Sequence, residues 1–284
     1  MSTGIVFHAI AAIIYLGLSA VLWGMLQAGK PMETPERVAR WVLLAALVAQ
    51  AVGLDALVLA GGNLHLSWLL ALSVAVWLGL VVFWLESLIV KIDGLLLILL
   101  PMAGVVTLLT SIFPGSHLIT SAAESALRGH LLLALGAYGL ITIAAVQSIL
   151  MAALDRHLHH PQDVVENASG LKRAIGRVLD AQPPLLVQER LLFRIIWIAF
   201  GALTLAIVSG GLISLATTGK WLPFDHKTVF TVLSWLTFGM LLLGRHLWGW
   251  RGRIALRYTL VGFVFVLLSY TGSRFVIEVL LNQG

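Results

Sequence analysis

The sequence of 284 residues has no cysteine and few charged side chains. Without cysteine the chain forms no disulfide, no thiolate zinc site and no thioredoxin-like redox centre. Charged residues make up only 11%, against about a quarter in an ordinary soluble domain. A soluble fold of this size needs a charged shell around its core. The composition therefore indicates that lipid is the solvent of this chain.

Apolar residues fill the chain instead. They make up 60% of it, and its mean hydropathy is +0.98. A bilayer crossing needs about 20 apolar residues, and the backbone in lipid must satisfy its own hydrogen bonds. The sequence therefore predicts an all-α integral membrane protein, a single polytopic membrane domain over 1–284. We expect eight transmembrane helices, at 5–27, 41–60, 67–85, 94–113, 130–153, 191–216, 227–247 and 257–281. The first lacks the basic run of a signal peptide and is expected to be retained.

The distribution of Lys and Arg predicts the orientation of these helices. Short loops rich in these residues stay on the cytoplasmic side. All but four of the 18 basic residues fall on one side, and the four on the other side are Arg128, Lys220, Lys227 and Arg274. Both chain ends are then expected outside. The pI of about 9.9 follows from this topology, and it requires no nucleic-acid partner.

The one long polar stretch, the cytoplasmic loop 154–190, contains two features. Its opening tract, 155–161, holds three histidines. Both a metal site and an ordinary exposed loop fit this tract, and we favour the loop because no carboxylate or thiol set completes a site. Further on, apolar residues recur at helical spacing beside Lys172, Arg173 and Arg177. They predict a short amphipathic helix at the anionic inner leaflet, with a structural or anchoring role favoured over partner recognition.

Two histidines at the outer face differ from the others in their setting. His130 opens the fifth span after Arg128, and His226 precedes the seventh beside Asp225 and Lys227. Haem is a flat apolar ring with two propionates, and its iron accepts two axial imidazoles. His130 and His226 would serve as iron ligands, and the cations would hold the propionates. The aromatic rings offered to the macrocycle are Trp221, Phe224, Trp235 and Tyr138. Interfacial His, Trp and Lys are also ordinary anchoring residues, so both readings stand on residue type alone.

Several motifs in order carry a resemblance to a known family. They run from His130 to Tyr138, then through Pro183-Pro184-Leu185 and 189–193, Asp225-His226-Lys227, 244–253 and 269–278. Together they resemble the cytochrome c assembly transmembrane family, to which CcsA and CcmC belong, and most of all its HemX and YpjD branch. The resemblance is strongest over 130–281. The first four spans agree in hydropathy and in little else.

This resemblance implies roles for single residues. Haem-handling members place an external histidine at the start of a span and a tyrosine in the same helix, as His130 and Tyr138 stand here. Their external Trp-rich segment ends in Trp-Asp-x-Lys, whereas this chain has Phe224-Asp225-His226-Lys227 and lacks the Trp-rich run. Their later external histidine is also missing, so His226 is our own choice of second ligand. His246 matches a histidine near the inner end of the same helix, and it serves either a second haem position or a helix cap.

The second span departs from the pattern of close relatives. They are expected to carry a histidine there, and this chain has Gln50 and Asp55. A second, intramembrane haem site is therefore in doubt. Asp55 itself marks either a proton or ligand path or a side chain near enough to Gly61-Gly62-Asn63 to reach the outer headgroups. The two readings of Asp55 are equally weighted.

Two functions follow from the resemblance and the residues together. The first is a non-enzymatic membrane protein that binds b-type haem non-covalently at the outer face, in a bacterial inner membrane, and that works with haem-handling or cytochrome c assembly proteins. The second is a HemX-like regulator of glutamyl-tRNA reductase, the first committed enzyme of tetrapyrrole synthesis, acting through the loop 154–190. No nucleophile elbow, phosphate loop or His-Glu-x-x-His signature occurs, and a transporter's inverted repeat is not evident.

Overall fold

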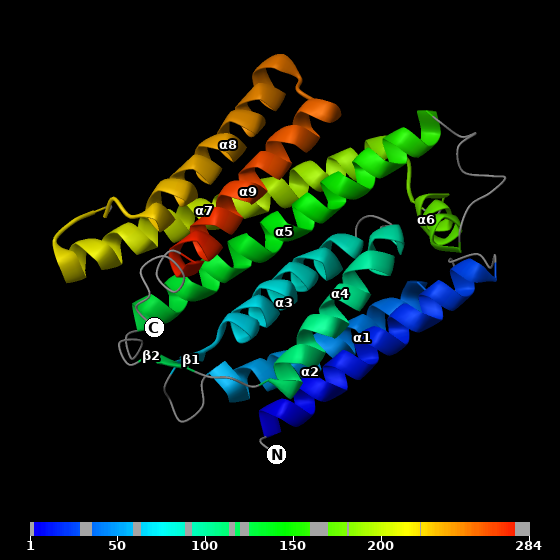
Figure 1. Cartoon of the computed structure of the whole chain (residues 1–284), viewed down its shortest axis with the longest axis horizontal. Coiled ribbons are helices and arrows are strands. Elements are labelled where there is room, and N and C mark those ends of the chain that lie inside the picture. Colours follow the sequence, from blue (N-terminus) through cyan, green and yellow to red (C-terminus); the bar gives the residue numbers. More distant parts are fainter. Residues whose placement is uncertain are drawn as a thin grey trace. The chain divides into compact units, whose positions relative to one another are not determined.

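A computed structural model describes residues 3–28, 36–58, 64–88, 93–113, 117–119, 125–159, 170–180, 182–221 and 223–275 (Figure 1). Helices dominate these residues, and one small two-stranded ribbon accompanies them. In chain order the elements are α1 (Thr3–Gln27), α2 (Glu36–Val58), β1 (Leu64–Leu66), α3 (Trp68–Ser87), α4 (Asp93–Ile112), β2 (His117–Ile119), α5 (Ser125–His159), α6 (Gly170–Asp180), α7 (Leu185–Thr218), α8 (His226–Trp248) and α9 (Arg253–Phe275).

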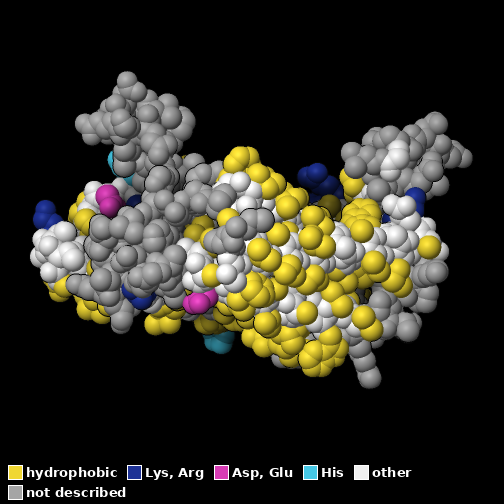
Figure 2. All heavy atoms as spheres, turned by 90° about the horizontal axis from the view of Figure 1, so that it is seen from below, with side chains coloured by type: hydrophobic (Ala, Val, Ile, Leu, Met, Phe, Trp, Pro, Cys, Tyr) yellow, Lys and Arg dark blue, Asp and Glu magenta, His cyan; other side chains and the backbone are white. Residues whose placement is uncertain are grey.

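The predicted transmembrane helices are present with nearly the predicted bounds. Seven described helices, α1 to α5, α7 and α8, are long and apolar enough to cross a membrane. The eighth prediction coincides with α9, although its last residues, 276–281, lie outside the described residues. Hydrophobic side chains cover much of the visible surface, with few charged ones among them (Figure 2). The chain is an all-α integral membrane protein.

Two of the helices are longer than their predicted spans. Helix α5 has 35 residues and α7 has 34, so each extends about 50 Å at 1.5 Å per residue, well beyond a hydrocarbon core of about 30 Å. Much of the loop 154–190 is therefore helical. The predicted amphipathic helix in this loop is α6, and it ends before Pro183-Pro184. The side chains of Lys172 and Arg173 lie outside the described residues.

Contacts along the chain divide it into two compact units, which are described separately. The first unit comprises residues 1–123 and 153–188, and the second comprises 124–152 and 189–284. The prediction of a single membrane domain stays a prediction. In the first unit α1 packs on α2 and α4, while α3 packs on the same two helices. The ribbon β1–β2 joins the outer loops that hold His65 and His117, with His65 opposite Leu118.

In the second unit α8 and α9 form an antiparallel hairpin (Figure 1). Phe238 of α8 lies directly over Gly262 of α9, where an added Cβ would come within 2.7 Å of its ring. Ser234 donates a hydrogen bond to the Gly262 carbonyl at 3.0 Å. Small residues let transmembrane helices approach closely. Gly262 therefore explains how two helices with large side chains pack so tightly at this point.

Candidate functional site

The predicted site centres on two adjacent glycines of α7, Gly210 and Gly211. A Cβ on Gly210 would meet Cε1 of His130 at 2.9 Å, and a Cβ on Gly211 would meet Cε2 of Trp221 at 2.9 Å. The His130 and Trp221 rings therefore rest on the bare backbone of consecutive residues. Both residues selected from the sequence therefore contact the same turn of α7.

The neighbours of His130 determine which ring nitrogen carries a proton. Nδ1 lies 3.0 Å from Oγ of Ser209, and the Ser209 hydroxyl donates its own proton to the Ala206 carbonyl at 3.2 Å. A hydroxyl has a single proton to donate. In the arrangement in which Ser209 donates to Ala206, Nδ1 is the donor to Ser209 and a neutral His130 has its lone pair on Nε2. The His130 ring also lies close enough to the Ala206 backbone to hydrogen-bond with it.

The segment Asp225-His226-Lys227 begins α8. The Asp225 carboxylate caps the helix and accepts a hydrogen bond from the Thr228 backbone N–H at 2.7 Å. Partial burial favours a higher pKa for Asp225, but hydrogen bonds from Thr228 and the charge of Lys227 outweigh it and hold that pKa below its usual value. His226 is exposed. Within the described residues, His226 makes no hydrogen bond or ion pair.

The other residues predicted for this site are Lys227, Phe224, Trp221 and Arg128. Lys227 lies close enough to His130 to interact with it electrostatically. Phe224 is 100% exposed and Trp221 is 42% exposed, so both offer apolar surface to a ligand or to lipid. Arg128 is half-buried and already engaged by a neighbouring group. No described contact joins His226 to His130.

Tyr138 has partners of its own within the chain. It hydrogen-bonds with Thr231 of α8 and Ser269 of α9, whose hydroxyls lie 2.8 Å apart. Both hydroxyls also lie within hydrogen-bond distance of the Lys227 carbonyl, at 2.7 and 3.0 Å. Tyr138 therefore ties three helices together just inside the His130 site. A similar interhelical bond occurs at Trp235, whose Nε1 donates to Thr204 of α7 at 2.9 Å.

At the other end of α8, residues of the sequence motifs 189–193 and 244–253 pack and bond around Arg245. This guanidinium bonds Oε1 of Glu189 at 2.9 Å and lies 3.6 Å from the centroid of the Phe193 ring. The other Glu189 oxygen accepts from the backbone N–H of Gly252 at 3.4 Å. Much of the sequence motif is therefore structural, because it joins α7 to the α8–α9 turn. His246, the residue after Arg245, is exposed, and its proposed haem or capping role stays a prediction.

Sequence reasoning missed a buried polar cluster in the first unit. His8, near the start of α1, has a fully buried side chain between α1, α2 and α3. Its Nε2 lies 3.4 Å from Oγ of Ser73, which accepts from Gln50 at 3.0 Å, and Gln50 in turn accepts from Tyr15 at 2.8 Å. Gln50, found where a histidine was expected, is thus fully bonded. The signal for this cluster was the set of polar residues within three apolar spans.

Asp55 does not belong to this cluster. Its side chain is exposed on α2, whereas the cluster is buried. The partner region proposed for it, Gly61-Gly62-Asn63, lies outside the described residues.

The histidine tract of the cytoplasmic loop is bound to its own helices. Nε2 of His157 lies 3.0 Å from Oδ1 of Asp180, at the end of α6. Nδ1 of His159 lies 3.5 Å from Oδ1 of Asp155, one turn earlier on α5. His160 is outside the described residues. Among the residues that are described, no group of three or more His, Cys, Asp or Glu side chains is placed to hold a metal ion.

Comparisons with known proteins extend the family resemblance over nearly the whole chain. The inner membrane protein YpjD of Escherichia coli K12 is 27% identical over 279 residues, which cover 95% of this chain and 97% of that protein. A 28.8 kDa protein of Azospirillum brasilense is 30% identical over 54% of this chain, which spans only 52% of that relative. The cytochrome c biogenesis protein CcsA of Gloeobacter violaceus is 29% identical over 96 residues, 34% of this chain and 28% of that protein.

No solved structure is significantly similar to the chain. The family match reaches further toward the N-terminus than the motifs that carried the resemblance in the sequence. The cytochrome c assembly protein family matches residues 38–281, which include the second, third and fourth spans, where sequence motifs were not evident. The multi-pass architecture and the similarity to YpjD make the chain a multi-pass inner-membrane protein. It belongs to the cytochrome c assembly protein family, and its role is a haem-related one in cytochrome c biogenesis.

Proposed function

We propose that this protein binds b-type haem non-covalently at the outer face of the membrane, with His130 as an axial ligand. The observation that carries the proposal is the contact between Nδ1 of His130 and the Ser209 hydroxyl. Nδ1 lies 3.0 Å from Oγ of Ser209, and histidines that bind metals almost always donate their other ring N–H to such a partner. The lone pair on Nε2 is the one that iron requires.

The neighbouring residues suit the rest of an amphiphilic ligand. Haem supplies an iron that takes two imidazoles and a ring with two acidic propionates. His226 is exposed at the start of α8, so its imidazole is accessible as a second ligand. Lys227, which interacts electrostatically with His130, would pair with a propionate. Trp221 and Phe224 expose apolar surface of the kind that a porphyrin face covers.

In this proposal the protein holds and presents haem without catalysing a reaction. The absence of a Trp-rich segment before Asp225 argues against the attachment of haem to an apocytochrome by this chain alone. Its partners would then be other haem-handling or cytochrome c assembly proteins, which receive the haem from it.

The absorption spectrum of the purified protein tests the proposal. Protein purified in mild detergent from haem-replete cells is expected to show a Soret band. His130→Ala and His226→Ala should each weaken or shift this band, whereas the matched control His159→Ala, an exposed histidine of α5, should leave it unchanged. A wild-type protein without a Soret band after haem addition would refute haem binding. An unchanged spectrum in both His130→Ala and His226→Ala would refute the assignment of these two ligands, but it would leave haem binding itself standing.

A further inference from the structure

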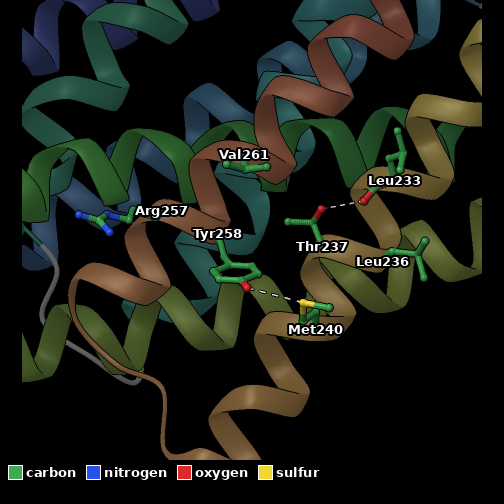
Figure 3. A pocket seen from close by; sticks show the side chains of 7 residues that line it. All are labelled: Leu233, Leu236, Thr237, Met240, Arg257, Tyr258 and Val261. Atoms are coloured by element: carbon green, nitrogen blue, oxygen red, sulfur yellow. Dashed lines mark hydrogen bonds between the residues drawn. The ribbon is translucent and has the colours of Figure 1, made fainter.

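A groove between α8 and α9 lies outside the residues used above. It has a volume of about 300 Å³ and is lined by Leu233, Leu236, Thr237 and Met240 of α8 and by Arg257, Tyr258 and Val261 of α9. Arg257 lies at one end of this lining and Leu233 at the other (Figure 3). From Leu233 to Met240 the groove follows α8 for about 10 Å, or two turns.

Most polar atoms of this lining are hydrogen-bonded to other lining residues. Thr237 donates to the Leu233 carbonyl at 2.8 Å, and the Tyr258 hydroxyl donates to Sδ of Met240 at 3.6 Å (Figure 3). Leu236 is 52% exposed and Met240 is 54% exposed. The open side of the groove is therefore apolar, as a surface that receives an acyl chain must be.

Arg257 is the exception in this apolar setting. Its side chain is exposed and, in the part of the chain that the structure describes, it makes no hydrogen bond or ion pair. Arg245, on the same hairpin, is instead neutralised by Glu189. Arg257 also lies on the side predicted to be cytoplasmic, where bacterial and other membranes expose anionic headgroups.

We propose that this groove is a binding site for one anionic phospholipid of the inner leaflet, with an acyl chain in the groove and its phosphate on Arg257. Lipid tails are as apolar as leucine, so the groove alone gives no preference over bulk lipid. The selectivity must come from the guanidinium, as in the basic pockets between transmembrane helices that hold anionic headgroups. This site is independent of haem binding.

A second copy of the chain is a poorer occupant. Close packing between transmembrane helices relies on small residues at the contact. Six of the seven lining residues, all except Thr237, are large or branched apolar, aromatic or cationic side chains. An acyl chain adapts to such a surface, whereas a rigid helix does not.

Native mass spectrometry of the delipidated protein tests the proposal. The protein is mixed with phosphatidylglycerol and phosphatidylethanolamine of identical acyl chains, and the retained lipids are compared. The wild type should retain one phosphatidylglycerol in preference to phosphatidylethanolamine. Arg257→Gln should reduce this preference about fivefold, the effect of one cation near an anionic headgroup. Arg190→Gln removes an exposed cation of α7 that does not line the groove. This variant should keep the preference for phosphatidylglycerol.

Two further variants complete the test. Val261→Phe fills the groove and should reduce the retention of both lipids. Because the chain has no cysteine, Met240→Cys provides a single thiol in the groove, and it should give no crosslinked dimer in membranes. An equal preference in Arg257→Gln and wild type would overturn the proposal, as would a wild type without any preference or an efficient Met240→Cys dimer.

Discussion

At the scale of single residues, the hydroxyl of Ser209 has the most specific consequence. It holds Nδ1 of His130 at 3.0 Å while donating its own proton to Ala206. Without it, the imidazole is free to rotate and to exchange tautomers. In the proposed haem site, Ser209 is a positioning residue that acts through His130.

The first prediction concerns this contact. Ser209→Ala should weaken haem affinity by about 10- to 100-fold, the range found when the outer partner of a metal-bound histidine is removed. Titration of the purified protein with haem, followed at the Soret band, measures this affinity. Thr217→Val is the control, because the Thr217 hydroxyl bonds only to carbonyls of its own helix. Equal affinities for Ser209→Ala and wild type would show that Ser209 does not position the ligand.

Asp225 gives a second prediction, on pH. Its pKa is held below the usual 3.8, so its capping bond stabilises the protein above that pH, and the stabilisation is lost as pH falls through the lowered pKa. Asp225→Ala should cost about 1 kcal/mol at neutral pH, seen as a lower melting temperature in detergent. Asp225→Asn keeps a cap but lacks the charge, so it should remain near wild type at pH 7 and lose this acid-dependent component.

If Asp225→Ala and wild type melt together at pH 7, the cap contributes nothing to stability. If Asp225→Asn follows the same acid profile as wild type, the pH dependence belongs to other carboxyl groups.

At the scale of helices, the close contact between α1 and α2 depends on a missing side chain. A Cβ on Gly53 would overlap Nδ1 of His8 and would come within 3.1 Å of the Gly4 carbonyl. Nδ1 of His8 is buried and, among the residues that the structure describes, has no hydrogen-bond partner of good geometry. Gly53 therefore provides the space that a buried imidazole occupies beside the Ser73 and Gln50 cluster.

The third prediction follows from this contact. Gly53→Ala should destabilise the protein by about 1–3 kcal/mol, the usual cost of overpacking, measured as a lower melting temperature in detergent. Gly17→Ala on α1 has open space around its Cβ and should be neutral. The double variant His8→Ala/Gly53→Ala should recover part of the loss. A Gly53→Ala protein as stable as Gly17→Ala would contradict this packing.

Helix α6 shows how an amphipathic segment is held by its own chain. Arg177 donates to the Gln27 carbonyl of α1 at 3.5 Å, and Asp180 contacts His157 of α5. Val178 and Leu179 are buried. These contacts favour the structural role predicted for α6. The HemX-like regulatory role through the same loop stays a prediction.

At the scale of the whole molecule, topology decides whether the proposed site exists. His130 and His226 stand at the starts of α5 and α8, and an outer-face haem site requires both starts on the same side. The bias of Lys and Arg predicts that side to be the outer one.

The fourth prediction tests this orientation in a chain that has no native cysteine. Lys220→Cys, before α8, should react with a membrane-impermeant maleimide in intact spheroplasts. Arg251→Cys, between α8 and α9, should react only after permeabilisation. Both positions are exposed, so burial does not explain a difference between them. The opposite pattern of labelling would invert the topology and exclude haem binding by these histidines at the outer face.

Sequence alone determined the helices, because hydropathy and backbone hydrogen bonding in lipid leave no other structure for long apolar segments. It also determined α6 through its spacing of apolar residues. It did not predict that α5 and α7 extend past the bilayer, because their polar ends, such as 154–159, lack the apolar signal by which spans are recognised.

Only the tertiary structure decided which polar side chains meet. Ser209 is 79 residues from His130, and nothing in local spacing links them. His8 is buried because Gly53 of the next helix leaves room for its ring. Periodicity reports the face that a residue occupies on its own helix. The partner opposite that face depends on how separate helices pack, and so do the tautomer of His130 and the groove beside Arg257.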